Sequence, residues 1–370
     1  MRKLALLLIC VLLVLTSCGG ASDEPTDAAS TVPEATNAVT APQSECDITT
    51  GTAPVAAPQS ETETEEVKAP ATEKGSARFL NNGMFIFDGA VYTQPWYAPG
   101  VLENYGSTTA YFGTVYPKAK VSVCVIPCSA IRVDDADVQS LLTDQGYIFD
   151  QMNAIIGKYG VNFVDTYGEM YAHRDEYMYF KTDHHWTQLG AYYAYKAYVE
   201  SIGLTATPLE AFEKVVITED YHGSLYGYTG DDEVLTFRDT VEAFFTKKAL
   251  TMTVTDQAGG TATYPDAIAR WSASYSAFLY GDNPYTVINV PENPQDRNVL
   301  VFKDSYGNAM VPFLAENFGN IIVVDTRYNP MNVAAELGDY PFTDVLFINN
   351  LEAANSQAWY ELYMRAAGLV

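Results

Sequence analysis

The chain is predicted to contain one α/β domain in which a parallel sheet is covered by helices. Apolar runs of strand length alternate with amphipathic stretches of helix length, and this order produces parallel strands joined by helical crossovers. Three late apolar runs end in polar residues instead of simply turning. Ligands bind at the carboxyl ends of strands in open α/β sheets, so the same pattern indicates where a site would lie.

The predicted elements begin near residue 79 with a hairpin at 85–92, because apolar stretches flank the turn Asp88-Gly89. Thr187 can cap a helix that starts at the next residue. The segment 208–294 has short β-like runs, Gly-rich turns and aromatic residues, and is predicted to be a β-rich insertion. The other predicted elements are strands at 120–126, 160–164, 299–302, 321–324 and 345–348, and helices within 138–159, at 188–202, at 308–317 and from about 351.

The first 75 residues differ from the rest in composition. Residues 1–18 start with two basic residues, continue as an apolar run and end in Leu-Thr-Ser-Cys, the pattern of a bacterial lipoprotein signal peptide. Cys18 is therefore the predicted lipid anchor, with an ordinary secretory signal as the alternative. Residues 19–75 contain almost no large apolar side chains, so we predict a disordered tether that holds the domain 76–370 outside the cytoplasm, at the bacterial membrane.

Composition limits the possible partners. The net charge of −25 argues against nucleic acid, because phosphate backbones bind basic surfaces. The 27 tyrosines fit carbohydrate binding, since aromatic rings stack on sugar faces, although core packing accounts for many of them. Cys124 and Cys128 are predicted to be buried free thiols. No cysteine spacing typical of a metal site is present, and neither a metal nor a cofactor is expected.

Two of the four histidines, His184 and His185, directly follow Asp183. A carboxylate two residues before an imidazole can orient the ring and stabilise its protonated form, as a general base requires. The sequence nearby supplies no nucleophile. The candidate is Ser305, which lies between a predicted strand and a helix N-terminus.

Backbone N–H groups and the helix dipole at such a terminus can stabilise an oxyanion. Tyr306 and Gly307 are therefore oxyanion or substrate candidates, and the glycine also allows a close approach to the backbone. Taken alone, Ser305 would be interpreted as a helix cap. Its combination with the Asp-x-His pattern favours catalysis.

Three segments carry a resemblance to a known family: FKTDHHWTQLGAY at 180–192, YHGSL at 221–225 and VFKDSYGN at 301–308. In this order they resemble the DHHW family, in the alginate O-acetyltransferase-like branch of the SGNH hydrolases. The resemblance covers essentially all of 79–370 and implies an SGNH-hydrolase-like fold. It also implies roles for three residues, with Ser305 as nucleophile, His185 as base and Asp183 as the carboxylate that orients the base. Lys-Asp-Ser replaces the usual Gly-Asp-Ser, which leaves the oxyanion donors open.

The remaining candidates also have structural interpretations. His184 is more often a solvent-facing or supporting residue than a catalyst. A zinc site formed by Asp183, His184, His185 and His222 is a disfavoured alternative, because adjacent histidines rarely bind one ion.

Arg327 and Asn349 lie at the ends of late strands and are candidates for oxyanion or substrate contacts. An equally good interpretation is that Arg327 forms an ion pair with an acid and that Asn349 is an ordinary turn residue. His222 and Tyr226 are candidates to line an acceptor groove, with core packing favoured for Tyr226.

The predicted reaction is acyl transfer: Ser305 takes an acetyl group from an ester and passes it to a hydroxyl of a cell-surface or secreted polysaccharide. Water as acceptor would make the protein a carbohydrate acetylesterase, and loss of catalysis would leave a glycan-binding lipoprotein. The resemblance to alginate acetylation implies a membrane O-acyltransferase that supplies the acetyl group outside the cell.

Overall fold

The structure is a computed structural model and describes residues 76–370. The predicted signal peptide, the lipidation site Cys18 and the tether lie outside the described residues. Within 76–370, no helix combines the length and the apolar character needed to cross a membrane.

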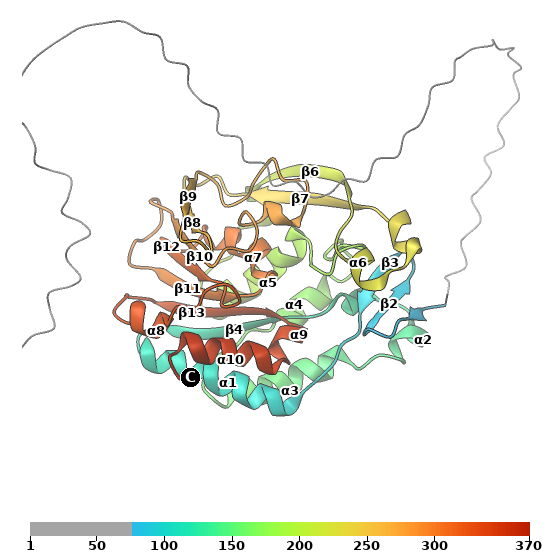
Figure 1. Ribbon diagram of the computed structural model, residues 1–370, viewed down its shortest axis with the longest axis horizontal. Helices are drawn as coiled ribbons and strands as arrows, with labels where there is room; N and C mark the ends of the chain where they lie inside the picture. Colours follow the sequence, from blue (N-terminus) through green and yellow to red (C-terminus); the bar gives the residue numbers. More distant parts are fainter. Residues whose placement is uncertain (1–75) are drawn as a thin grey trace, which may run out of the picture. The chain divides into compact units, whose positions relative to one another are not determined.

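The centre of the domain is an eight-stranded mixed sheet with the strand order β5-β4-β13-β11-β12-β10-β8-β9 (Figure 1). Its first five strands are parallel, and the last three run antiparallel to their neighbours. The parallel strands are β4 (Lys120–Ile126), β5 (Asn162–Phe163), β11 (Asn298–Lys303), β12 (Asn320–Val324) and β13 (Asp344–Asn350). The antiparallel strands are β8 (Thr251–Thr255), β9 (Thr261–Tyr264) and β10 (Tyr285–Asn289).

The prediction of a parallel sheet is therefore confirmed for its five strands, and the three antiparallel strands come from the segment predicted as a β-rich insertion. The predicted insertion 208–294 divides into two parts in the structure. Its first part forms a separate hairpin, whereas β8 to β10 extend the main sheet. Alternation of buried and half-exposed residues in β8 is typical of an antiparallel strand with one solvated face, but the pairing of β10 with β12 is a tertiary contact that local pattern does not reveal.

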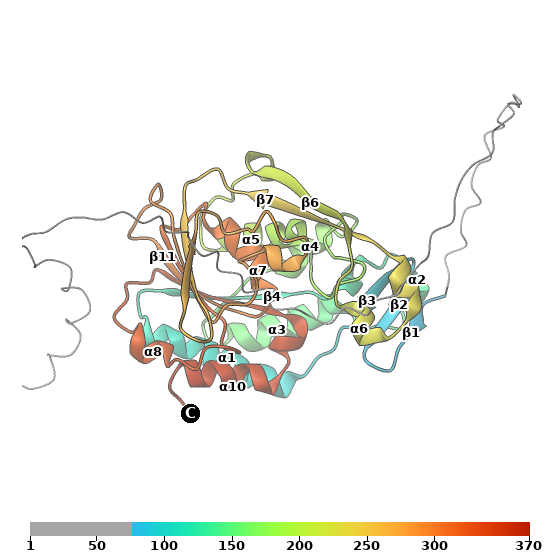
Figure 2. The same cartoon turned by 45° about the horizontal axis from the view of Figure 1, so that its top comes forward.

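Helices cover both faces of the sheet because successive strand residues point to opposite sides. In β4, Val121, Val123 and Val125 pack on one side, and Cys124 and Ile126 pack on the other. Figure 2 shows the two helical layers. The first contains α1 (Pro99–Val115), α3 (Gln145–Gly157) and α10 (Gln357–Ala366), and the second α4 (Thr166–Ala172), α5 (Gln188–Ser201) and α7 (Gly307–Leu314).

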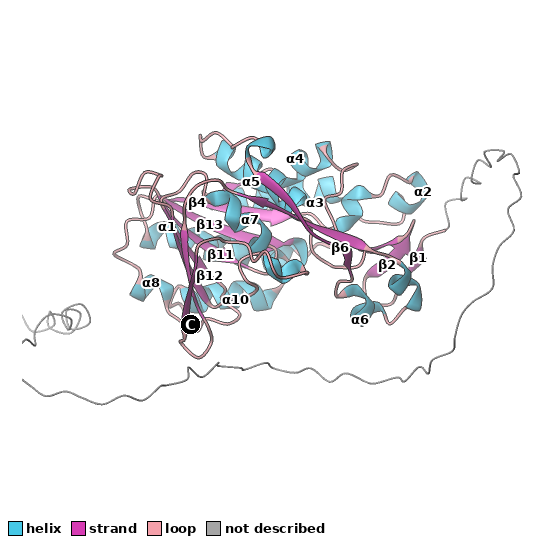
Figure 3. Cartoon of the chain, turned by 90° about the horizontal axis from the view of Figure 1, so that it is seen from above, coloured by secondary structure: helices cyan, strands magenta, loops and turns pink. Residues whose placement is uncertain are grey.

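Two small antiparallel sheets lie beside this core (Figure 3). The predicted hairpin is confirmed, and its turn at Asp88 and Gly89 has positive φ at both positions, as a tight hairpin requires. The small sheets comprise β1 (Arg78–Phe79), β2 (Met84–Phe87) and β3 (Ala90–Thr93), and β6 (Glu213–Tyr221) with β7 (Asp239–Phe245). The short helices are α2 (Ala136–Gln139), α6 (Leu225–Thr229), α8 (Val333–Glu336) and α9 (Leu351–Ala354), and 3-10 turns lie at Ser129–Arg132, Leu209–Ala211, Asp232–Thr236 and Tyr275–Ala277.

Most predicted helices are present, with shifted ends. Thr187 caps α5 as predicted, accepting a hydrogen bond from the Gly190 N–H. The predicted helix within 138–159 begins only at residue 145, because Asp144 caps α3 there. Cys124 and Cys128 are buried free thiols, as predicted.

The parallel strands β4, β11, β12 and β13 end at the same edge of the sheet. The segments that follow β11 and β12 carry Ser305 and Arg327, and α9 follows β13 directly. The fold therefore gathers three strand ends that the sequence had marked by their polar residues.

Candidate active site

Ser305 lies in the turn between β11 and α7. The buried Asp304 carboxylate fixes this turn, accepting hydrogen bonds from the Tyr306 N–H at 2.8 Å and the Asn350 N–H at 2.7 Å. A Cβ atom at Gly307 would lie 2.6 Å from the Cβ of Lys303, so only glycine fits this close approach. The serine is thus presented from a rigid strand end.

The loop that carries the histidines is held by a second buried carboxylate. Asp239 on β7 accepts hydrogen bonds from the N–H groups of Lys181 and Thr182, both at 2.8 Å, and from the Thr182 hydroxyl at 2.6 Å. Trp186 is fully buried, and its indole N–H donates to the Tyr306 carbonyl at 3.0 Å. The predicted insertion and the serine turn therefore both anchor this loop.

Asp183, His185 and Ser305 form one continuous hydrogen-bonded chain. The Nδ1 atom of His185 lies 2.6 Å from Oδ1 of Asp183, and its Nε2 atom lies 2.7 Å from Oγ of Ser305, although 120 residues separate the two. Because Asp183 accepts from Nδ1–H, Nε2 is left to accept the serine proton. The structure thus brings the three predicted residues together in the order that nucleophile activation requires.

Asp183 is a fully occupied acceptor. Its Oδ1 also accepts from the His185 N–H at 2.9 Å, and its Oδ2 accepts from the Tyr221 hydroxyl and the Ser224 N–H, both at 2.9 Å. Burial alone would raise the pKa of this carboxyl, but the hydrogen bond and charge of His185 outweigh burial and hold the pKa well below its usual range. Gly223 permits this packing, because a Cβ atom there would lie 2.2 Å from the Cβ of Asp183.

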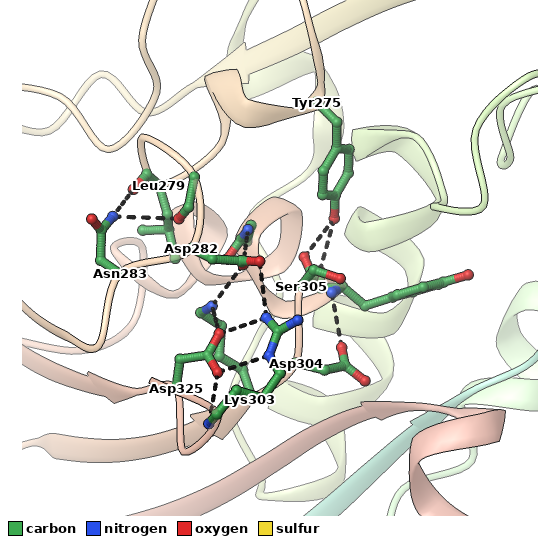
Figure 4. Close-up of polar contacts among 12 residues, drawn as sticks. Tyr275, Leu279, Asp282, Asn283, Lys303, Asp304, Ser305 and Asp325 are labelled. Carbon is green, nitrogen blue, oxygen red and sulfur yellow. Dashed lines mark hydrogen bonds and ion pairs between the residues drawn. The ribbon is translucent and has the colours of Figure 1, made fainter. Parts of the chain in front are cut away.

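Tyr275 supports the opposite face of the histidine. Its ring stacks on His185 with centroids 3.7 Å apart and an interplanar angle of 7°. Its hydroxyl donates towards the carbonyls of Ser305 and Tyr306, at 2.9 and 3.2 Å (Figure 4). Tyr275 was not among the predicted site residues, because it lies in an irregular segment that gives no periodic signal.

The structure explains the position of His184. Its Nδ1 lies 2.8 Å from the Ser224 hydroxyl, and its ring packs against His185 at 3.7 Å between centroids. Burial lowers the pKa of His184 to about 4, and the positive charge of His185 adds to the shift. His184 is thus a neutral imidazole beside the catalytic candidates at pH 7, in agreement with a supporting role.

The zinc alternative fits the structure poorly. Donor atoms of Asp183, His184 and His185 lie within 4.8 Å of one another. However, Nδ1 of each histidine is already hydrogen-bonded, one to Asp183 and the other to Ser224. His222, the fourth proposed ligand, does not belong to this group of donor atoms. A metal would therefore have to break the hydrogen-bonded chain.

A cavity of about 250 Å³ opens at Ser305. Residues from distant parts of the chain line this cavity, and they include Cys128, His184, Tyr228, Arg327, Glu352 and Trp359. Arg327 belongs to a network of ion pairs: its guanidinium binds Asp325 at 2.7 and 2.9 Å and Asp282 at 3.0 Å, and Figure 4 shows these two carboxylates. Burial opposes the charged form of Arg327, but these carboxylates raise its pKa above the ordinary value.

Asn349, which was predicted to contact the oxyanion or the substrate, lies away from the cavity at Ser305. Asn349 is fully buried; its amide oxygen accepts from the hydroxyls of Tyr105 and Tyr363, both at 2.7 Å, and its NH2 group donates to Asp304 at 3.4 Å. Asn349 therefore faces the α1 and α10 layer and does not line the cavity. Strand alternation could have indicated this, since Phe347 faces the same layer.

The predicted groove residues His222 and Tyr226 are exposed and do not line the cavity at Ser305. Exposure of Tyr226 also contradicts its expected core packing. Tyr228, two residues later, lines the cavity instead.

The backbone donors of Tyr306 and Gly307 are occupied, because their N–H groups bond to the side chain and the carbonyl of Asp304. Among the described residues, the Ser305 N–H has no hydrogen-bond acceptor.

The chain is similar to known proteins in its sequence profile and in its fold. The sequence profile of the DHHW family, described as "DHHW protein", matches residues 65–324. No curated protein matches the chain. A DHHW family protein from Eubacterium siraeum is similar in structure, with 25% identity, a TM-score of 0.69 and coverage of 78% of this chain and 97% of that one.

PatB1 from Bacillus cereus, solved with a sulfonyl adduct, is 18% identical with a TM-score of 0.62, covering 76% of this chain and 99% of that one. The O-acetyltransferase domain of Pseudomonas putida AlgJ is 14% identical with a TM-score of 0.41, covering 79% and 99%. The family profile spans well over half of the chain. This protein therefore belongs to the DHHW family.

Proposed function

We propose that this protein is an SGNH-type O-acetyltransferase that works outside the cytoplasm and acetylates a cell-surface or secreted polysaccharide through an acyl-serine. One observation carries the proposal: the chain from Asp183 through His185 to Ser305 ends at a cavity. A hydroxyl activated in this way attacks carbonyl carbons.

In the first step, Oγ of Ser305 attacks the carbonyl carbon of an acetyl ester while His185 takes the serine proton at Nε2. His185 then gives this proton to the departing alcohol, which leaves acetyl-serine. In the second step a sugar hydroxyl loses its proton to His185 and attacks the acetyl carbon. The Ser305 oxygen leaves and recovers the proton.

The oxyanion formed in each step needs hydrogen-bond donors. The Ser305 N–H is the available donor of this turn, since the next two N–H groups are bonded to Asp304. The N-terminus of α7 adds a favourable dipole. We therefore assign the first oxyanion contact to the nucleophile's own backbone.

The surroundings of the cavity suit a carbohydrate acceptor. Trp359 and Tyr228 supply aromatic rings on which a sugar can stack. The predicted lipid anchor at Cys18 would hold the domain at the membrane, where a membrane O-acyltransferase would supply the acetyl donor. The acidic composition argues against a nucleic-acid partner.

The direct test measures hydrolysis of a chromogenic acetyl ester and transfer of acetyl mass to oligosaccharides by mass spectrometry. Wild-type protein should release the chromophore and form acetylated sugar, and Ser305→Ala and His185→Ala should abolish both. A sulfonyl fluoride should add mass at Ser305 in the wild type only. Free acetate without sugar product would indicate an esterase, and unchanged turnover in Ser305→Ala would disprove the mechanism.

A further inference from the structure

The cavity at Ser305 has one permanently cationic lining residue among the described residues, Arg327, and this cation is already neutralised. Arg327 and the buried Lys303 share the carboxylates of Asp325 and Asp282, with the Lys303 Nζ atom at 2.8 and 3.3 Å from them. Two cations and two anions form a neutral group. The arginine therefore offers little net attraction for an anionic ligand.

Two carboxyl side chains of the cavity lie outside this network: Asp304, which is hydrogen-bonded, and Glu352. Glu352 lies in the first turn of α9, and none of the described residues forms a hydrogen bond or ion pair with its carboxylate. Burial raises the pKa of the Glu352 carboxyl above its ordinary value, and its charge in turn acts on two other groups at the site. Burial raises the pKa of Cys128 to about 12, and Glu352 adds to this shift; it also contributes, after burial, to the raised pKa of Tyr306.

The remaining groups do not balance Glu352. His184 is neutral at pH 7, as described above, and Asp304 is satisfied by two backbone N–H groups. Trp359 lies on the same side of the site as Arg327, whose guanidinium is 5.7 Å from the centre of the indole ring. A sugar ring packed near Trp359 would meet an unpaired carboxylate within the same cavity.

We propose that Glu352 selects the acceptor by charge, so that the bound sugar carries no carboxylate and an amino sugar with a free ammonium group binds best. This inference rests on the proposed function in one respect, namely that the cavity at Ser305 binds the acceptor. Glu352 is a specificity residue here, since a carboxylate can pair with an ammonium group and repels a uronate. Amino sugars should therefore bind most tightly, neutral sugars less tightly and uronates least tightly.

Equilibrium binding tests this order without requiring turnover. The full chain carrying Ser305→Ala is titrated calorimetrically with tetrasaccharides of glucosamine, N-acetylglucosamine and galacturonic acid at pH 7 and low salt. Glucosamine should bind best and galacturonate worst. Adding Glu352→Gln should narrow the ratio of the two Kd values by about tenfold or more, the scale expected for removing one unit charge from a partly screened site. Glu361→Gln, on the exposed face of α10, removes the same charge outside the cavity and should leave the ratio unchanged.

The inference is overturned if galacturonate binds as well as glucosamine, if Glu352→Gln leaves the ratio unchanged, or if none of the three sugars binds. Acetyl transfer by the wild type is scored separately. A protein that hydrolyses esters without acetylating sugars, yet binds glucosamine through Glu352, would disprove the transferase and retain the charge selection. Acetylation of galacturonate in preference to glucosamine would leave the transferase standing and refute the role of Glu352.

Discussion

Replacement of Tyr275 separates two contributions to the geometry of the site. In Tyr275→Phe the stack on His185 is kept and one hydroxyl is lost. The two carbonyls that accept from this hydroxyl keep other donors, the Asn308 N–H for Ser305 and the Trp186 indole for Tyr306. No buried acceptor is therefore orphaned, and the loss of unfolding free energy should be about 0.5–1.5 kcal/mol, that of one ordinary hydrogen bond. We expect kcat to stay within about threefold, because the ring still restrains the imidazole.

Tyr275→Leu removes the stack as well. Truncating a buried aromatic side chain costs about 2–5 kcal/mol, and the imidazole loses the surface that fixes its plane, so kcat should fall by at least about tenfold. Chromogenic ester turnover and urea unfolding measure the two effects. Phe278→Leu is the matched control: it is buried in the same segment with its ring 5.4 Å from Tyr275, so stability should fall while kcat is largely kept. Equal losses of kcat in Tyr275→Phe and Tyr275→Leu would refute the importance of the stack.

Four further substitutions probe the charges of the site. The folded state holds the pKa of Asp183 below its ordinary value of about 3.9. The ionised carboxylate should therefore make its full contribution to the free energy of unfolding above about pH 3.9, and this contribution should be lost progressively as the pH falls below that value. Urea unfolding should therefore show Asp183→Asn less stable than wild type at pH 7, with the difference shrinking near pH 3; a constant difference would contradict the assigned shift. His184→Gln should lower kcat/KM by roughly tenfold or less, since the glutamine can still reach Ser224, whereas His185→Gln should lower it by roughly 10³-fold or more; equal losses would assign the base to both rings. Lys303→Met leaves the buried Asp325 and the partly exposed Asp282 with Arg327 as their one cation, so the free energy of unfolding should fall by about 3 kcal/mol, and a loss below about 1 kcal/mol would show that the network is not stabilising.

The three residues of the hydrogen-bonded chain could be predicted because their relation is largely local. Asp183 and His185 are two residues apart on one loop, and Ser305 follows a strand that the apolar pattern identifies. Tyr275 could not be predicted in the same way, since its contact with His185 depends on how an irregular segment folds back over the sheet. Glu352 follows a predicted strand, but only the structure shows that its carboxylate lacks a cation.

The fold, like the site, was predicted only in part. The strands β4, β11, β12 and β13 are continuous apolar runs with clear ends, and each was located within one or two residues. The antiparallel addition of β8 to β10 was missed, because strand partners far apart in sequence leave no periodic trace. The position of Asn349 could have been predicted, because the alternation of side chains along β13 places it on the same face of the sheet as Phe347.

The contact between Gly223 and Asp183 gives a way of reading related sequences. A side chain of any size at position 223 would collide with the Cα, the Cβ and the carboxylate of Asp183, so the YHGSL segment can lie this close to the DHHW motif only with glycine at this position. Every residue other than glycine carries a Cβ, so replacing Asp183 alone would not relieve this collision, and a substitution at position 223 must move the two segments apart. A related sequence that lacks this glycine is therefore expected to hold the first acid of its motif in a different position, even where the serine is retained.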